Sequence, residues 1–163
     1  MVDVRALALD LLARRRVLIL STADREGPWA APVFFAADGF RLYFVSDPAT
    51  RHGRAIGGGA TVAGAVTADF ERWQDIEGLQ LEGFAAPVGS AEHEARARAV
   101  YLARFPFAAE FLSPGGPLYE RAGRKVAWYA LDVRRLWLTD NRLGFGTRLC
   151  LEVGPATGPA GGA

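Results

Sequence analysis

The side chains that could do chemistry gather in one short run, from Phe40 to Gly57. Alternating apolar residues at its start predict a strand that faces a core, and the turn sequence at 46–48 ends that strand. Thr50, Arg51 and His52 then stand at the start of a predicted short helix. A hydroxyl, a guanidinium, an imidazole and free backbone N–H groups at a helix start suit a phosphate group. The alternative is a solvated turn with a surface arginine, and the run alone fits both.

Few other side chains offer reactive or metal-binding chemistry. Cys150 is the sole cysteine, which excludes an intrachain disulfide, and we expect an inert thiol packed in an apolar strand. The two histidines, His52 and His93, lack carboxylates at ligand spacing, so no metal site is predicted. We expect His93 on a solvated helix face. The common nucleotide loops are missing, because no G-x-G-x-x-G follows a strand and no G-x-x-x-x-G-K-S/T occurs.

Composition indicates one globular domain. The 163 residues are half hydrophobic and carry a net charge of +1, so neither a nucleic-acid nor a membrane-surface footprint is visible. The apolar stretch at 17–20 is far too short to span a bilayer, and no secretory pattern opens the chain, so we expect a soluble cytoplasmic protein. We place a single domain at 1–153. The Gly-, Pro- and Ala-rich tail at 154–163 is predicted to be disordered.

Hydrophobic periodicity predicts a mainly β chain with flanking helices. The expected helices cover 2–14 and 90–104, and the expected strands cover 17–22, 29–36, 40–45, 60–68, 79–88, 125–133, 136–139 and 148–153. We expect the first three strands to form an antiparallel meander with short hairpin connections. Six or seven antiparallel strands with two helices imply a closed or nearly closed barrel.

Three separated segments together resemble one family. They are LYFVSDPATRH at 42–52, WQDIEGLQLEG at 73–83 and LWLTDNRLGFGTR at 136–148. In this order and spacing they resemble the pyridoxamine 5'-phosphate oxidase-like flavoproteins, and most nearly the small bacterial split-barrel proteins, over about residues 17–153. The resemblance implies a six-stranded antiparallel split β-barrel that dimerises. It also implies that flavin mononucleotide (FMN) binds in two clefts at the dimer interface.

The resemblance assigns the phosphate end of the cofactor site to one stretch. The family's S/T-R-K segment, which grips the flavin phosphate, corresponds to Thr50, Arg51 and His52, with histidine in the lysine position. A histidine beside a phosphate would be favoured in its charged form. The preceding strand end, Val45 and Ser46, matches the part of the family fold that lines the ribityl chain.

The resemblance also assigns the ring end of the cofactor. The strand that offers its backbone to the isoalloxazine ring corresponds to Ala31, Pro32, Val33 and Phe34. Trp137 and Arg148 resemble the late tryptophan and arginine that reach the flavin from the second chain. Gln80 could hydrogen-bond the ring, although an outward-facing strand glutamine explains it equally well.

The implied function is that of an FMN-dependent oxidoreductase acting on an unknown small substrate. No catalytic residue is assigned, because the cofactor would carry the redox chemistry. The alternatives are a non-catalytic flavin-binding or carrier protein, and a haem-binding protein on the same barrel with His52 as a ligand. Vitamin B6 oxidation is not expected, since the oxidase's late R-L-x-x-R pattern is replaced by the segment at 142–148.

Overall fold

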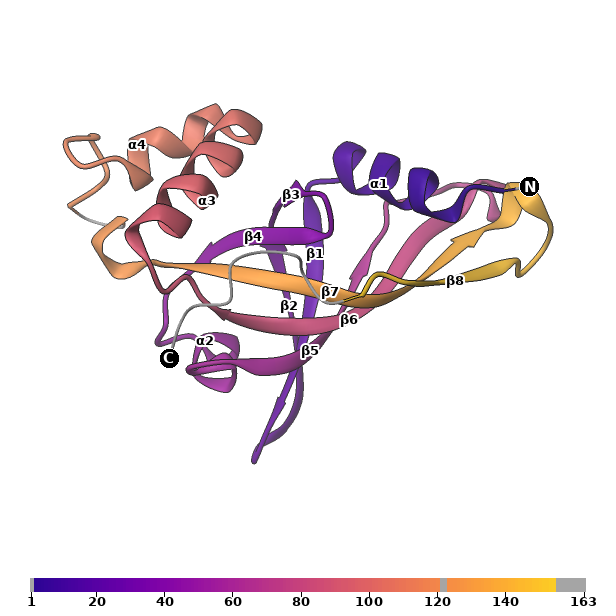
Figure 1. The fold of residues 1–163 in the computed structure, drawn as a ribbon, viewed down its shortest axis with the longest axis horizontal. Helices are drawn as coiled ribbons and strands as arrows, with labels where there is room; N and C mark the ends of the chain where they lie inside the picture. The colour runs from indigo at the N-terminus through magenta and orange to yellow at the C-terminus, as the bar shows by residue number, and fades with distance from the viewer. Residues whose placement is uncertain (1, 121–122, 155–163) are drawn as a thin grey trace.

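A computed structural model describes residues 2–120 and 123–154 of the chain, so most of the predicted tail lies outside the described residues. Figure 1 shows one strongly curled β-sheet with helices on its outside. The four α-helices among the described residues are α1 (Val4–Arg14), α2 (Arg51–Ile56), α3 (Ala91–Arg104) and α4 (Ala109–Leu112). The strands are β1 (Val17–Asp24), β2 (Gly27–Phe34), β3 (Ala36–Asp38), β4 (Arg41–Ser46), β5 (Ala60–Val66), β6 (Glu77–Pro87), β7 (Ala127–Asp140) and β8 (Arg148–Glu152).

Side-chain caps start the helices where the sequence predicts them. Asp3 accepts a hydrogen bond from the backbone N–H of Ala6 (3.0 Å) at the start of α1, and Ser90 accepts one from His93 (3.2 Å) at the start of α3. Gly57 ends α2 with a positive φ of 52°, as a C-cap glycine does. Two short 3₁₀ turns, η1 (Trp73–Asp75) and η4 (Asn141–Leu143), lie near the ends of β6 and β7.

Within the described residues the strands form one eight-stranded antiparallel sheet in the order β2-β1-β5-β6-β7-β4-β3, with β8 also paired to β7. This confirms the mainly β split-barrel class, although the described residues form eight strands rather than the six that the resemblance implies. The two strands expected at 125–133 and 136–139 are one strand, β7, so that prediction was wrong. The register shifts opposite Glu82 and Gly83, which pair with Arg135 and Val133, so Arg134 is an extra residue in a β-bulge. The two arginines that interrupt the apolar alternation, Arg134 and Arg135, lie at this bulge.

The predicted meander of the first three strands was also wrong. β1 and β2 form a hairpin, but the strand expected at 29–36 breaks at Phe35, which is fully buried. The Phe35 N–H donates to the Arg16 carbonyl (3.0 Å) rather than to a ladder partner of β4. β3 and β4 then form a separate hairpin, and β4 pairs with the first half of β7.

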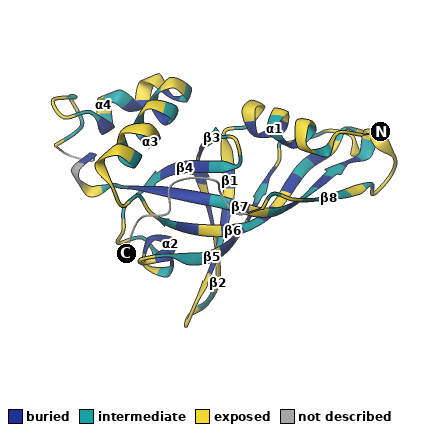
Figure 2. Ribbon diagram, viewed as in Figure 1, coloured by how far each residue is buried: buried dark blue, intermediate teal, exposed yellow. Residues whose placement is uncertain are grey.

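The inner face of the curled sheet forms the main core. On β6 the buried residues alternate as predicted at Leu79, Leu81, Gly83 and Ala85, and α1 closes one opening with Leu11. Figure 2 shows buried positions following the strands and exposed ones on the outer sides of the helices. The buried inner face therefore fixes which side chains of each strand point outward.

A second core lies between α3 and the outer face of β4 and β7. Tyr43 and Trp128 from the strands pack against Tyr101 and Phe105 from the helical segment. The rings of Tyr101 and Trp128 meet edge to face, with centroids 5.5 Å apart. α3 thus covers the outer face of the sheet at β4 and the first half of β7. No helix of the described residues is both long and apolar enough to cross a membrane.

A buried ion-pair network ties α1 to the sheet through Glu77, the first residue of β6. Its side chain is only 6% exposed and accepts hydrogen bonds from Arg14 (2.8 Å), Arg15 (2.6 Å) and Arg142 (2.6 Å). Arg142 also pairs with Asp140 (2.8 Å). The Arg14 guanidinium, assisted by those of Arg142 and Arg15, holds the pKa of Glu77 below its ordinary 4.5. Removing this carboxylate would take away the partner that the three guanidinium groups share.

We therefore expect Glu77→Gln to lower the free energy of unfolding by about 2 kcal/mol, below the 3–5 kcal/mol of fully buried pairs because the arginines are partly exposed. Urea denaturation at pH 7 measures it. Because the pKa of Glu77 is lowered on folding, its contribution is complete above pH 4.5 and is lost as the pH falls through the folded value. The variant should therefore lose stability less steeply in acid. Asp75→Asn, which breaks an exposed pair with Arg72, is the control and should leave the free energy of unfolding nearly unchanged. Equal losses in the two variants would contradict the role of Glu77.

Candidate functional site

The predicted phosphate stretch forms a compact cluster of hydroxyls around a buried imidazole. His52 is 9% exposed, and its Nε2 lies 2.6 Å from the Ser46 hydroxyl and 3.2 Å from the Thr50 hydroxyl. Thr50 donates its own hydrogen to the Asp47 carbonyl (2.7 Å) and accepts from the Gly53 N–H (3.1 Å). Because α2 is only six residues long, these side chains, rather than a helix dipole, define this end of the site.

Burial lowers the pKa of His52 below its ordinary 6.5. The imidazole is therefore neutral at pH 7 and is engaged by Ser46 and Thr50. A charged His52 in the manner of the family's lysine is not the resting state of this cluster. The hydroxyl groups, oriented by His52, are the polar groups that the cluster offers to a ligand.

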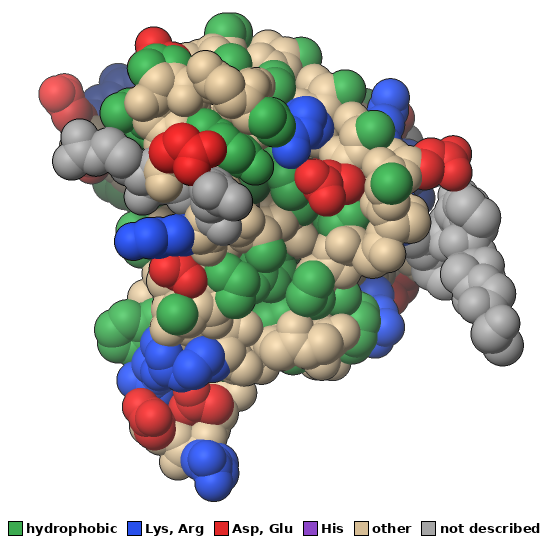
Figure 3. All heavy atoms as spheres, turned by 90° about the vertical axis from the view of Figure 1, so that its left-hand side faces the viewer, with side chains coloured by type: hydrophobic (Ala, Val, Ile, Leu, Met, Phe, Trp, Pro, Cys, Tyr) green, Lys and Arg blue, Asp and Glu red, His purple; other side chains and the backbone are tan. Residues whose placement is uncertain are grey.

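Arg51 extends from the same turn toward the hairpin that joins β1 and β2. Its Nη2 lies 3.3 Å from Asp24 and 3.2 Å from the Gly27 carbonyl, and its guanidinium lies 4.9 Å from the centre of the Trp29 ring. Figure 3 shows basic and acidic side chains gathered at the lowest point of the molecule, where the hairpin ends, below a hollow lined with apolar side chains. The Nε of Arg51 is buried and has no hydrogen-bond partner within the described structure. Arg51 thus keeps donor capacity that the fold does not use.

The predicted ring-binding strand splits its residues between two faces. On β2, Ala31 and Val33 point into the core, whereas Pro32 and Phe34 are exposed on the outer face. Val45 packs against the second core under α3. Ala31 and Val33 can therefore offer a ligand on the outer face their backbone atoms but not their side chains.

Gln80, Trp137 and Arg148 meet on the outer face of the sheet, where no helix covers it. They line a cavity of about 480 Å³ together with the small side chains of Ser21, Ala63 and Ala65. Gln80 stands directly opposite Trp137 in the ladder between β6 and β7. The Arg148 guanidinium lies 6.0 Å from the centre of the Trp137 ring, and no carboxylate of the described residues pairs with it. Among the four cavities compared in this section, it is the one whose arginine has no carboxylate partner among the described residues.

The cavity belongs to a continuous outward-facing row across six strands. The ladder pairings connect Pro32, Ile19, Ala65, Gln80, Trp137 and Cys150, in that order. Cys150 is exposed at the end of this row, so the prediction of a packed thiol was wrong: its strand, β8, has one face open. The sequence reasoning did not single out Ala63 and Ala65, although two small residues at outward positions of β5 are the signal for a hollow.

Along β7, the strand partners of the two ends of the predicted site are well separated. Ser46 pairs with Ala127 at the start of β7, and Gln80 pairs with Trp137 near its end. From Ala127 to Trp137 the strand runs ten residues, about 30 Å at about 3.3 Å per residue. Figure 1 shows α2 and β8 at opposite ends of the sheet. Across the sheet the two ends lie closer, because Ser21 of the cavity precedes Thr22, which pairs with Trp29, and the Arg51 guanidinium lies 4.9 Å from the Trp29 ring.

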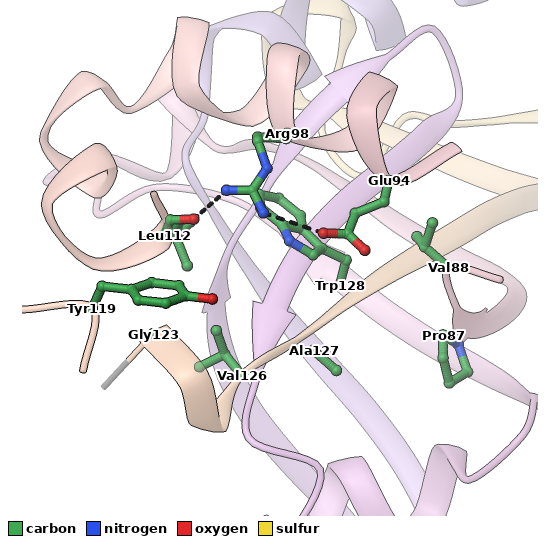
Figure 4. A pocket seen from close by; sticks show the side chains of 10 residues that line it. All are labelled: Pro87, Val88, Glu94, Arg98, Leu112, Tyr119, Gly123, Val126, Ala127 and Trp128. Carbon is green, nitrogen blue, oxygen red and sulfur yellow. Dashed lines mark hydrogen bonds and ion pairs between the residues drawn. The ribbon is translucent and has the colours of Figure 1, made fainter. Parts of the chain in front are cut away.

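The other cavities hold charges that are already paired. In the one shown in Figure 4, of about 230 Å³, Arg98 lies over the Trp128 ring, donates to the Leu112 carbonyl and pairs with Glu94 (3.2 Å). A cavity of about 340 Å³ beneath α1 contains the Glu77 network. These side chains would have to break existing ion pairs to bind a charged ligand.

A third such cavity, of about 510 Å³, lies between the start of α3 and β4. There Arg41 pairs with Asp132 and Arg96 with Asp38, each through two contacts. His93 is half-buried in its wall, with Nε2 3.2 Å from the Tyr43 hydroxyl. The expectation of a solvated His93 was therefore wrong, because its ring packs edge to face on the Tyr43 ring, with centroids 5.7 Å apart.

Comparison with known sequences finds one family over most of the chain. Residues 5–141 match the profile of the family described as pyridoxamine 5'-phosphate oxidase. The chain is 32% identical over 143 residues to a protein of Photorhabdus laumondii named UPF0306 protein plu4501, covering 86% of this chain and 90% of that protein.

Comparison with solved structures finds the same fold. A heme-binding protein from Mycobacterium smegmatis superposes with a TM-score of 0.69 at 20% identity, covering 89% of this chain and 57% of that one. A FAD-binding protein from Mesorhizobium loti superposes with a TM-score of 0.62 at 16% identity, covering 80% and 91%. These structural likenesses establish the fold and leave the bound group to the chemistry of the residues.

The buried, neutral state of His52 predicts its titration. We expect His52 to titrate below pH 6.5 in the ligand-free protein, because charging it requires desolvating the imidazolium. Histidine NMR signals followed from pH 5 to 8 measure this, and His52→Gln assigns them because the chain has two histidines. Since the unfolded chain binds the proton more readily, this residue makes stability rise with pH between its folded pKa and 6.5. A His52 pKa above 6.5 would contradict the neutral assignment.

Proposed function

Because the chain belongs to the pyridoxamine 5'-phosphate oxidase family, we propose that it is an FMN-binding flavoprotein, active as a homodimer with the cofactor between the two copies. The observation that carries the proposal is the unpaired Arg148 over Trp137, beside Gln80, in the uncovered cavity of the sheet. A flavin ring has flat apolar faces and polar atoms along one edge. An indole, an amide and a guanidinium around a hollow of small side chains suit such a ring.

The phosphate end of FMN would lie at the turn before α2. Arg51 has a buried Nε without a partner there, and the Ser46 hydroxyl is within reach of the same turn. A phosphate dianion takes charge-assisted hydrogen bonds from a guanidinium and from hydroxyls. The alanine and phenylalanine at positions 30 and 35, where the vitamin B6 oxidase has an arginine and a lysine, place more of this task on Arg51.

In this proposal, the second copy of the chain completes the site. The outward face carries four exposed large apolar side chains: Val17 and Ile19 on β1, Phe34 on β2 and Phe84 on β6. Burying such a face in a two-fold dimer would stabilise it, and an obligate interface of this kind covers roughly 2,000 Å² or more. With outer face against outer face, Arg148 of the second copy can approach the β2 strand and the Arg51 turn of the first.

When bound, FMN supplies the hydride or electron transfer. The chain's own residues would bind the phosphate, stack on the ring and exclude water. The substrate would be a small molecule of unknown identity, and vitamin B6 oxidation is not proposed. A flavin carrier that does not turn over a substrate would use the same binding site and is the alternative within this proposal.

Haem binding is the second candidate, because similar structures include a heme-binding protein. Its requirement is an axial ligand. Both histidines of this chain have Nε2 engaged, His52 by two hydroxyls and His93 by the Tyr43 hydroxyl. The ligand-free chemistry therefore favours a flavin.

The visible spectrum of the protein titrated with each group tests this choice. We expect FMN to bind with flavin bands, quenched flavin fluorescence and a stoichiometry of one per chain. Added haem should not give a sharp Soret shift that depends on His52, so the wild type and His52→Ala should give the same haem spectrum. Tight haem binding lost in His52→Ala, with no FMN binding, would overturn the proposal. Bleaching of bound FMN by NAD(P)H would then favour an oxidoreductase over a carrier.

A complementation experiment tests the shared site. Arg51→Ala and Arg148→Ala should each weaken FMN binding by about ten- to a hundredfold, since each removes charge-assisted hydrogen bonds of about 1.5–3 kcal/mol. If one site takes Arg51 from one copy and Arg148 from the other, mixing the two variants restores an intact site in each mixed dimer. Random exchange would then recover tight binding in about a quarter of the sites.

Arg148→Lys is the conservative counterpart of Arg148→Ala, and it should bind FMN more tightly than Arg148→Ala but less tightly than wild type. Cys150 gives an independent readout, because its exposed thiol should become protected from alkylation in the dimer. No recovery on mixing, although subunits exchange, would place both arginines in the same chain's site or in none. A monomer by light scattering at micromolar concentration would exclude the shared site.

A further inference from the structure

Arg51 is not free in this structure but is held by the hairpin between β1 and β2. We propose that Asp24 sets the phosphate affinity of the site by competing with the ligand for Arg51. The inference rests on the proposed function, since it concerns the same phosphate group. By this competition, Asp24 lowers the preference of the site for a phosphorylated flavin over one without a phosphate.

The contact that holds Arg51 is poorly made. Its Nη2 lies 3.3 Å from Asp24, and its Nε lies 3.8 Å from Glu26 and makes no hydrogen bond although it is buried. By contrast, Arg96 reaches Asp38 through two hydrogen bonds, both of 2.9 Å. Arg51 is thus held in place without the two-point pairing that makes a guanidinium–carboxylate pair strong.

The contact between Arg51 and Asp24 is also partly shielded from water. The side chains of Arg51 and Asp24 are 22% and 26% exposed, so water screens this pair less than it would an open surface pair. The guanidinium additionally lies over Trp29, and its second carboxylate neighbour, Glu26, is 3.8 Å away. A phosphate dianion at the turn would offer Arg51 a stronger, two-point partner, and Arg51 would give up Asp24 to take it.

Asp24 has a second task that a test must leave intact. Its carboxylate accepts the backbone N–H of Glu26 (2.8 Å) and so shapes the hairpin turn. Asp24→Asn keeps an oxygen at this position and removes the charge. Asp24→Ser keeps a smaller acceptor, as a second variant in case the first does not fold. Glu26→Gln is the matched control, because the Glu26 side chain is 70% exposed and lies farther from Arg51.

The experiment titrates FMN and riboflavin into the dimeric protein by quenching of flavin fluorescence. We expect Asp24→Asn to tighten FMN binding about three- to tenfold and to leave riboflavin affinity unchanged. Glu26→Gln should change FMN affinity less than twofold. Inorganic phosphate, added as a competitor against FMN, should become effective at correspondingly lower concentration in Asp24→Asn.

The double variant separates competition from plain repulsion. In Arg51→Ala, Asp24→Asn should no longer tighten FMN binding, because there is no guanidinium to release. If the gain persists without Arg51, Asp24 acts by repelling the phosphate directly and the competition is overturned. If FMN binds, Arg51→Ala weakens it and Asp24→Asn equals wild type, the inference also fails. If no variant binds FMN, the proposed function itself fails, which is a distinguishable result.

Discussion

The unbroken pairing of β7 is the interaction on which the rest of the structure depends. β6 runs along its whole length, while β4 takes the other edge of its first half and β8 that of its second half. The bulge at Arg134 lies between the two partners, where the strand must change course. This arrangement curls the sheet, seals its inner face as the core, and places the α2 turn and the Trp137 cavity at opposite ends. The distance between the two half-sites is therefore a property of the sheet itself.

A second regularity is that the charged side chains of the buried network and of several cavities form ion pairs with nearby residues. Glu77 has its three arginines, and the cavities beside α3 hold guanidinium groups that carboxylates already engage. Within the cavities described above, Arg148 is the arginine without a carboxylate, and Arg51, like Arg15, keeps a buried Nε without a hydrogen bond. Ion pairs of this kind contribute modestly to stability, so leaving two arginines incompletely paired costs the fold little. It keeps donor capacity for an anionic or polar ligand.

The sequence predicted the elements with local signals well and the long-range pairings less well. Caps, turns and apolar alternation located α1, α3 and β6, because these depend on residues a few positions apart. The partner of β4 could not be read from spacing, since a strand after a hairpin and a strand beside β7 have the same alternation. The site residues followed from the family resemblance, but their division between two ends did not, and neither did the hold of Asp24 on Arg51. Both arise from the curl of the sheet, which brings the β1–β2 hairpin to the α2 turn.

The change from lysine to histidine at position 52 follows from this geometry. A lysine there would need a path to solvent or to a phosphate for its charge, whereas His52 is buried and satisfied by Ser46 and Thr50. A neutral imidazole stabilises the turn without a ligand, and it leaves the positive charge of the turn to Arg51 and to Arg54, which donates to the Ala49 carbonyl. Of these two, Arg51 is the one held by the Asp24 carboxylate, so the strength of that contact influences how readily an anion enters. The substitution at 52 and the contact between Arg51 and Asp24 are therefore two parts of one electrostatic arrangement.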